Sequence, residues 1–192
     1  ATCTGSPKTF TITVNPTPNA VATPASQTIC SGSTIAIIVL TGNVAGTVYN
    51  WVRDNSVTVT GIAAGGAGDI NGSLTNITNV PVTVTFTITP VYTNAGVTCT
   101  GAPITATVTV NPIPTVNVQA DQTVCVGTIT TATFTGTVSG TVYNWTNTNT
   151  NIGLGASGTG NISFTSTNAT AVPITGTITV TPAYTNEGTT CT

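Results

Sequence analysis

Five cysteines carry most of the chemical capacity of this sequence, which contains no histidine and only two basic and four acidic residues among 192. Two of them precede a glycine turn and three lie in a repeated Thr-Cys-Thr or Val-Thr-Cys context: Cys30 and Cys125 form the first class, and Cys3, Cys99 and Cys191 the second. Their spacings contain no Cys-x-x-Cys pair, and without histidine the supply of zinc ligands is poor. We therefore predict extracellular disulfides, with no metal site and no cofactor.

The two classes reflect an internal repeat, because the chain is one unit written twice. The segment NPTPNAVATPASQTICSG returns as NPIPTVNVQADQTVCVG, GTVYNW returns unchanged, and ITPVYTNAGVTCT returns as VTPAYTNEGTTCT. Cys30 and Cys125 are 95 residues apart, and Trp51 and Trp145 are 94 apart. A period of this length corresponds to a whole domain and not to a solenoid rung. The sequence therefore predicts two modest domains.

The charged residues differ between the two copies, so none of them marks shared chemistry. In the alignment of the two copies each corresponds to an uncharged residue: Lys8 to Ile104, Arg53 to Asn147, Asp54 to Thr148, Asp69 to Asn161, Asp121 to Ser26 and Glu187 to Ala95. Because histidine is absent and the four acidic residues are scattered, neither a nucleophile with its base nor a carboxylate pair can be assembled. We predict that the chain is not an enzyme.

Two features could bind a ligand, and each has a plainer structural explanation. Asp69 and Asn71 offer oxygen atoms at i and i+2, as in a calcium loop, but the second copy has Asn161 in place of the carboxylate. Trp51 and Trp145 could stack on sugars, but each lies inside a segment that reads as a strand. The segment around Asp69 is better interpreted as a glycine-rich loop, and the two tryptophans as core residues.

The composition bears on two further classes of function. With Lys8 and Arg53 as its only cations and a net charge of −2, the chain cannot neutralise a run of phosphates, which excludes nucleic-acid binding. The longest apolar run, residues 35–40, is far shorter than the roughly 20 residues of a membrane helix, so we expect no membrane insertion. No basic and apolar signal peptide opens the chain, and both ends fall inside the repeat, so we expect a segment of a longer array.

Apolar residues alternate with threonine along several segments, as expected for half-buried strands. Every second residue is apolar at 82–88 and 104–110, and Phe10, Ile12 and Val14 follow the same pattern. No segment has apolar residues at helical spacing over a helical length. The predicted fold class is all-β, with strands in the first full copy near residues 19–24, 26–30, 34–41, 46–53, 57–60, 73–78, 81–91 and 97–110.

Two Asn-Pro-x-Pro stretches divide the chain. Proline has no N–H to give to a sheet ladder, so short, stiff joints are expected at Pro16 and Pro18 and again at Pro112 and Pro114. The division predicts the final strand of an upstream repeat, or a donor strand, at 1–15, a complete repeat at 16–111, and a second repeat without its last strand at 112–192. Residues 16–111 are called the first repeat below, and residues 112–192 the second repeat.

About eight short strands per copy, with one tryptophan on the third long strand, fit an immunoglobulin-like antiparallel sandwich. The motifs C-[SV]-G, GTVYNW, TPxYTNxGxTCT and VxVNPxP resemble the PKD-like and immunoglobulin-like tandem repeats of large secreted adhesins and surface filaments of Bacteroidota. The resemblance covers essentially the whole chain. It implies sandwiches in an extended array on the bacterial surface or in a secreted filament, without catalytic residues. Trp51, Trp145 and Phe86 are expected in the cores.

The cysteine pairing depends on where a sandwich places its turns. In an immunoglobulin-like sandwich the first turn and the last hairpin lie at opposite poles, about 30 Å apart for strands of about nine residues, whereas bonded cysteines have Cα atoms within about 7 Å. The first turn of one repeat instead faces the last hairpin of the next. This geometry favours Cys30–Cys191 across the joint, and pairing within each repeat, Cys30–Cys99 with Cys125–Cys191, stays open.

The nearly uncharged edges favour assembly, because free edge strands usually carry charges that block unwanted pairing. We predict a non-catalytic structural repeat of an extracellular filament or adhesin stalk, whose partners are neighbouring copies of itself along a fibre and whose joints and disulfides carry load. Two alternatives stay open. One is an adhesive module that binds surface glycans or proteins through loops 61–72 and 151–160, and the other is a pilus-like subunit in which residues 1–15 complete the second repeat of another chain by strand addition.

Overall fold

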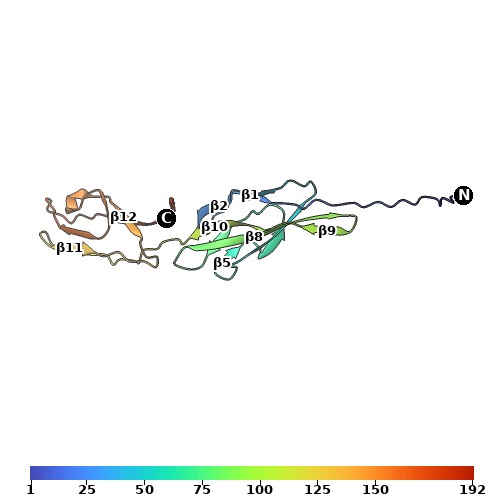
Figure 1. The fold of residues 1–192 in the computed structure, drawn as a ribbon. Coiled ribbons are helices and arrows are strands. Elements are labelled where there is room, and N and C mark those ends of the chain that lie inside the picture. Colours follow the sequence, from blue (N-terminus) through green and yellow to red (C-terminus); the bar gives the residue numbers. More distant parts are fainter.

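The computed structural model describes residues 1–192 as an elongated all-β chain with sixteen strands and one 3-10 turn of helix at Thr150–Ile152. Figure 1 shows two β units in line, with the N-terminal segment extending from one end. Each repeat has a hydrophobic cluster of its own. None of the helical structure has the length and apolarity of a membrane span.

One layer of the first repeat is a six-stranded sheet. Its strands run in the order β2–β10–β8–β4–β6, and β9 pairs with β8 outside this path. Strand β10 pairs antiparallel with β8 and parallel with β2, so it lies inside the sheet. The bounds are β2 Ser26–Cys30, β4 Val48–Arg53, β6 Gly65–Ala67, β8 Val82–Asn94, β9 Val97–Thr100 and β10 Ile104–Asn111.

The opposite layer consists of two short strand pairs, β1 with β3 and β5 with β7. Isolated bridges join Thr34 to Ser73 and Ile38 to Ile70 between them. The bounds are β1 Val21–Thr23, β3 Val39–Thr41, β5 Val59–Gly61 and β7 Leu74–Asn76. Fifteen buried hydrophobic residues form the core of the repeat. This all-β arrangement is consistent with an immunoglobulin-like sandwich and confirms the predicted fold class.

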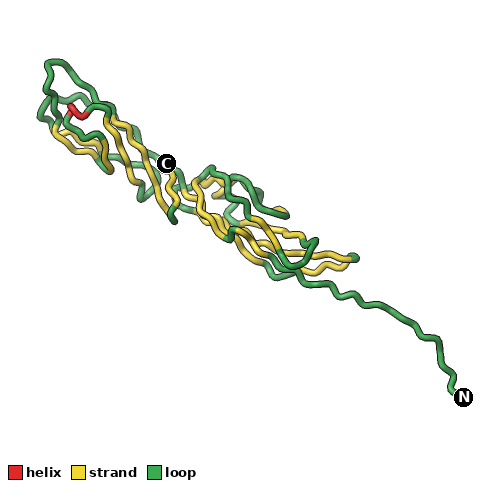
Figure 2. The backbone as a smooth tube through the Cα atoms, turned by 90° about the horizontal axis from the view of Figure 1, so that it is seen from above, coloured by secondary structure: helices red, strands yellow, loops and turns green.

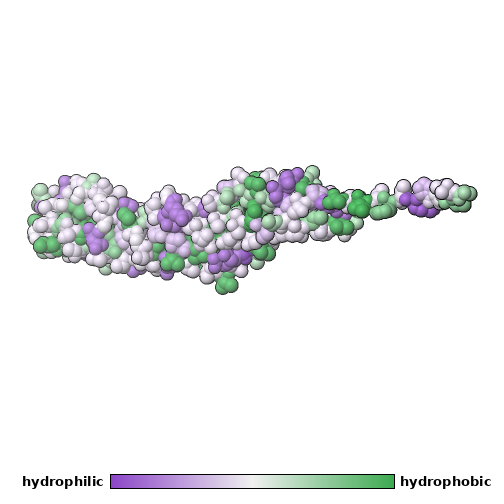
Figure 3. Space-filling view, viewed as in Figure 1, coloured by the Kyte–Doolittle hydropathy of each residue, from purple (hydrophilic) through white to green (hydrophobic).

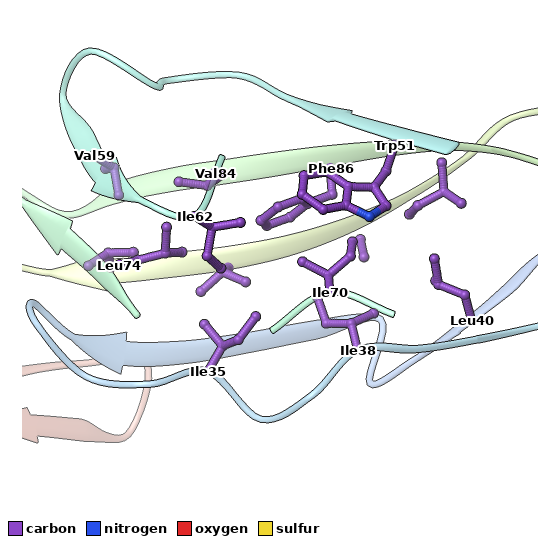
Figure 4. Close-up of a cluster of buried hydrophobic side chains, with 14 of the residues drawn as sticks. Ile35, Ile38, Leu40, Trp51, Val59, Ile62, Ile70, Leu74, Val84 and Phe86 are labelled. Atoms are coloured by element: carbon purple, nitrogen blue, oxygen red, sulfur yellow. The ribbon is translucent and has the colours of Figure 1, made fainter. Parts of the chain in front are cut away.

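The core of the first repeat follows from the alternation along β8 and β10. Successive side chains of a strand point to opposite faces, so the apolar residues of both strands share the inner face. Six of them have no exposed surface: Val84, Phe86, Ile88, Ala106, Val108 and Val110. Figure 4 shows Phe86 beside Trp51, with ring centroids 5.7 Å apart in an edge-to-face arrangement. Burying a large apolar side chain in this way contributes about 1.5–3 kcal/mol.

Three predicted elements differ from the observed ones. The segment predicted as one strand at 97–110 is two strands, β9 and β10, separated by residues 101–103, which end in a proline that has no N–H for a ladder. Of the strand predicted at 34–41, only β3 pairs continuously, and the rest makes the isolated bridges. The predicted loop at 61–72 contains β6, which pairs with β4.

The second repeat contains only part of this sandwich. One sheet has the order β13–β12–β15–β16, and a separate pair joins β11 to β14. Residues 112–128 form no strand, so the second repeat has no counterpart of β2. Its cluster contains four buried residues, against fifteen in the first repeat. The bounds are β11 Ile129–Ala132, β12 Val142–Asn147, β13 Ser157–Thr159, β14 Ile162–Thr165, β15 Ile178–Asn186 and β16 Thr189–Cys191.

Residues 1–15 form no strand and extend away from the first repeat, as Figure 2 shows. Phe10, Ile12 and Val14 are 85%, 78% and 87% exposed, although their alternation is that of a buried strand face. Figure 3 shows hydrophobic surface, in green, along this segment where it meets the first repeat. The segment therefore has the pattern of a strand without a sheet.

Candidate functional site

A disulfide crosses the joint between the two repeats. Cys30 is the last residue of β2, and Cys191 is the last residue of β16. The two are bonded, with Cα atoms 5.6 Å apart across a sequence separation of 161 residues. Cys191 is 1% exposed, so the disulfide is shielded from solvent at this residue. The repeats are thus connected covalently at two points, the polypeptide between β10 and β11 and this bond.

The other three cysteines are free. Cys3 and Cys125 are exposed, and Cys99 is half-buried in β9. Figure 1 shows β9 at the end of the first repeat that is remote from the joint, whereas β2 points toward the joint. Pairing within each repeat, Cys30–Cys99 with Cys125–Cys191, is therefore not the arrangement of this chain, because the first repeat places its two cysteines at opposite ends.

Hydrogen bonds from both repeats surround the disulfide. The Thr28 hydroxyl donates to Glu187 Oε2 at 2.6 Å, and the Thr189 hydroxyl donates to the Thr28 carbonyl at 3.3 Å. Asn186 Nδ2 donates to Asn111 Oδ1 at 2.9 Å, and Asn111 Nδ2 donates to the Asn186 carbonyl at 3.3 Å. The carboxylate of Glu187 thus has a structural role at the joint, where its bond to a hydroxyl is charge-assisted.

The joint prolines share a motif but differ in burial. Pro112 and Pro114 are buried in the joint, directly after Asn111, which the second repeat contacts. Pro18 is also buried, but Pro16 is exposed at the start of the first repeat. Because proline fixes φ, both stretches have few ways to bend. Of the first prolines of the two stretches, Pro112 is buried and Pro16 is not.

Arg53 and its counterpart Asn147 both bind backbone carbonyls inside their repeats. Arg53, which is 9% exposed, donates from Nε to the Ile62 carbonyl at 2.8 Å. Asn147, which is 8% exposed, donates from Nδ2 to the Leu154 carbonyl at 3.0 Å. Desolvation lowers the pKa of Arg53, and the nearby Asp54 carboxylate partly opposes this effect. The guanidinium of Arg53 and the amide of Asn147 therefore have the same structural role, which is to bind backbone carbonyls.

Asp69, the candidate calcium ligand, accepts a backbone hydrogen bond. Its Oδ1 accepts from the Leu40 N–H at 2.8 Å, and in the second repeat Asn161 Oδ1 accepts from the Phe134 N–H at 2.9 Å. An amide oxygen thus replaces the carboxylate in the same position. No group of three or more His, Cys, Asp or Glu side chains lies close enough together to hold a metal ion.

The two tryptophans lie over glycines in the interior. Trp51 and Trp145 are each 9% exposed. A Cβ on Gly66 would collide with the indole of Trp51, and a Cβ on Gly158 would collide with that of Trp145. Trp51 Nε1 donates to the Gly68 carbonyl at 3.1 Å, while Trp145 Nε1 is buried without a partner. The rings pack inside the sandwiches, and the predicted ligand-binding loops, which contain these glycines, are tied to the cores.

The second repeat has an open groove at the place where the first repeat holds β10. The groove has a volume of about 760 Å³. One wall includes Ile178 and Val180 of β15, and the other includes residues 119–124, the counterpart of the segment that forms β2. Phe134 and Leu154 of the buried cluster line its floor.

The comparison with family models gave a match. A family model described as a PKD-like domain matches residues 27–114, which run from β2 to the joint. The first repeat is similar to a PKD-like domain. Domains of this kind are generally non-catalytic and typically extracellular. The comparison with curated proteins gave no match.

Proposed function

We propose that this chain is a non-catalytic structural segment of an extracellular filament or adhesin stalk and carries load along its length. The observation that carries the proposal is the disulfide Cys30–Cys191, which links two sandwiches instead of closing one. PKD-like domains are typically extracellular, and disulfides persist in that environment. The two repeats lie in line, so a force along the molecule must cross their joint (Figure 1).

The disulfide shortens the path of a pulling force. A force applied between the N-terminal segment and Thr192 passes from Cys30 through the sulfur atoms to Cys191, and it bypasses the 161-residue separation between them. The backbone of most of both sandwiches is therefore not extended while the bond is intact. At about 3.4 Å per residue, reduction would make on the order of 500 Å of additional chain available for extension.

The joint also resists bending. The polypeptide crosses it after β10, and the disulfide crosses it between β2 and β16. Two connections at separate points leave less freedom of rotation than one linker. The hydrogen bonds from Thr28 to Glu187 and between Asn111 and Asn186 restrict the remaining motion.

Single-molecule pulling with handles at residues 1 and 192 tests this proposal. The oxidised protein should show no long extension step, because the force bypasses the two sandwiches. Reduction, or the change Cys30→Ser, should reveal unfolding steps that together release on the order of 500 Å. Cys125→Ser is the matched control, because it removes a cysteine that is free in this chain. Long steps in the oxidised protein would contradict the load-bearing role.

The extracellular location has its own test. Alkylation of the protein taken from its source, before any reduction, should leave Cys30 and Cys191 unlabelled. Rapid labelling of both would show that the protein resides in a reducing compartment. That result would contradict the location without affecting the geometry of the joint.

A further inference from the structure

We propose that Asn71 is a site of spontaneous covalent modification, at which its side-chain amide is lost through a cyclic imide formed with the backbone nitrogen of Gly72. The site lies between β6 and β7, inside the first repeat. Asn71 and Gly72 form the only Asn-Gly pair in the sequence. The proposal does not depend on a role in a filament, so the two can be tested separately.

The fold leaves the reacting groups of both residues uncovered. Asn71 is exposed, and Gly72 has no side chain that could cover its own nitrogen atom. Attack of this nitrogen on the Asn71 Cγ closes a five-membered ring, because only the carbonyl carbon, Cα and Cβ of Asn71 lie between the two atoms. The reaction is therefore intramolecular, and proximity takes the place of a catalytic group.

Hydrogen bonds do not hold the reacting groups in place. The N–H, the carbonyl and the side-chain amide of Asn71 make no hydrogen bond within the protein, and neither does the Gly72 N–H. The Asn71 amide can therefore turn over the Gly72 nitrogen without the loss of a hydrogen bond. The proton that this nitrogen must release is also not shared with an acceptor of the protein.

A second exposed asparagine of the same repeat has the opposite arrangement. Asn55 also precedes a small residue, Ser56, but Asn55 Nδ2 donates to the Thr83 carbonyl at 2.7 Å. The carbonyl of Asn55 accepts from the Val59 N–H at 2.9 Å. These bonds hold the side chain and the backbone of Asn55 away from ring closure. Asn55 is therefore an internal reference for the reaction at Asn71.

The corresponding loop of the second repeat does not contain a reactive pair. Its asparagine, Asn161, is followed by Ile162, whose β-branched side chain crowds the nitrogen that would have to attack. Asn161 Oδ1 also accepts from the Phe134 N–H at 2.9 Å. The modification is therefore confined to the first repeat, and the second repeat is a control within the same molecule.

The reaction needs only water as a co-reactant. The Gly72 nitrogen loses its proton to the solvent and bonds to the Asn71 Cγ, while the Cγ–Nδ2 bond breaks and Nδ2 takes up a proton and leaves as ammonia. One water molecule then opens the imide. Cleavage of the new Cγ–N bond gives aspartate, and cleavage of the original peptide bond gives isoaspartate, whose backbone runs through Cβ and Cγ. In sum, an amide and water become a carboxylate and ammonium.

The backbone on both sides of Asn71 is anchored, so isoaspartate should disturb the sandwich. Ile38 and Ile70, which lie side by side in Figure 4, exchange two backbone hydrogen bonds of 2.9 and 3.1 Å. The Ile35 N–H donates to the Gly72 carbonyl at 2.9 Å. Isoaspartate inserts one more atom into the backbone between these anchors, so both sets of bonds cannot keep their register. The layer that contains these bridges should therefore loosen as the protein ages.

The experiment incubates the full chain in heavy-oxygen water and follows each asparagine by peptide mapping, with fragmentation that separates isoaspartate from aspartate. Asn71 should gain one heavy oxygen at least about 10-fold faster than Asn55, and faster at alkaline than at neutral pH, because the attacking nitrogen must lose its proton. Asn71→Gln is the matched control, since its six-membered ring should close at least about 10-fold more slowly. Equal rates at Asn71 and Asn55, or aspartate without isoaspartate, would overturn the proposal.

Amide hydrogen exchange of fresh and aged protein measures the structural effect. The Ile35 and Ile38 N–H groups should exchange at least about 10-fold faster after modification, while the Phe134 N–H of the second repeat should not change. Fresh Asn71→Asp protein, which has the carboxylate without the extra backbone atom, should match the fresh parent chain. Unchanged exchange at Ile35 and Ile38 in isoaspartate-containing protein would contradict the loosening of the layer. None of these outcomes depends on the pulling experiment.

Discussion

The two repeats share their motifs but differ in how far the sandwich is closed. The first repeat buries fifteen hydrophobic residues in its cluster and the second repeat four. The difference centres on one strand, β10, which lies between β8 and β2 and covers the inner face of β8. Without such a strand the counterpart of β2 does not pair, and the inner face of β15 lines an open groove. An inner strand therefore pairs with the strands on both sides of it and also contributes its own side chains to the core.

The largest expected effect comes from opening the first repeat in the same way. Val108→Asp puts a carboxylate at a position on β10 with no exposed surface, and it should lower the free energy of unfolding by about 4 kcal/mol or more. Urea unfolding followed by tryptophan fluorescence measures the change, since each repeat has one tryptophan. Thr105→Asp, on the exposed face of β10, is the control. Similar losses for the two variants would contradict the assigned faces.

A pair of counterpart residues sharpens the comparison. Phe86→Ala should cost about 3–5 kcal/mol, because Phe86 is fully buried and the substitution leaves a closed cavity. Ile178→Ala should cost only about 1 kcal/mol, because Ile178 is half-buried in an open groove that water can enter. Denaturant titration of both variants gives the two values. Equal costs for the two variants would show that the groove is closed.

The smallest expected effect concerns an acid that the two repeats do not share. Asp69→Asn should change the stability by less than about 0.5 kcal/mol, because Asn161 accepts the same backbone hydrogen bond in the second repeat. Asp69→Ala should cost about 1–2 kcal/mol, because the Leu40 N–H then has no acceptor. Thermal or urea unfolding measures both changes. A loss with Asn as large as that with Ala would mean that the charge of Asp69 matters in itself.

The alternation of apolar and polar residues predicted some strands correctly and failed for others. The alternation at 82–88 and 104–110 correctly indicated strands with an apolar inner face, because side-chain direction in a strand depends only on neighbouring residues. The same pattern at 97–110 concealed the break at residues 101–103 that separates β9 from β10. The pattern also missed β6, since three small residues, Gly65 to Ala67, carry no alternation.

The roles of the unrepeated polar residues needed the structure. Arg53 and Asn147 differ in charge and size, and nothing in their types shows that both bind carbonyls of the following loop. Asp69 resembled a metal ligand until its bond to the Leu40 N–H was visible. Each role depends on a backbone group that the fold brings close to the side chain. The residue types around the side chain do not show which backbone group this will be.

The sequence by itself determined that the chain is all-β, that it is one unit written twice, and that its few charges belong to no shared site, because these properties follow from residue types and their order. Only the tertiary structure decided which cysteine bonds to which, because the choice between Cys99 and Cys191 as partner of Cys30 depends on where separate sandwiches place their ends. It also decided which copy of a nearly identical pattern is buried. A β-strand has its hydrogen-bonding partners outside itself, so residues 5–15 and 101–111 differ in burial through the sheet that surrounds one of them and not the other.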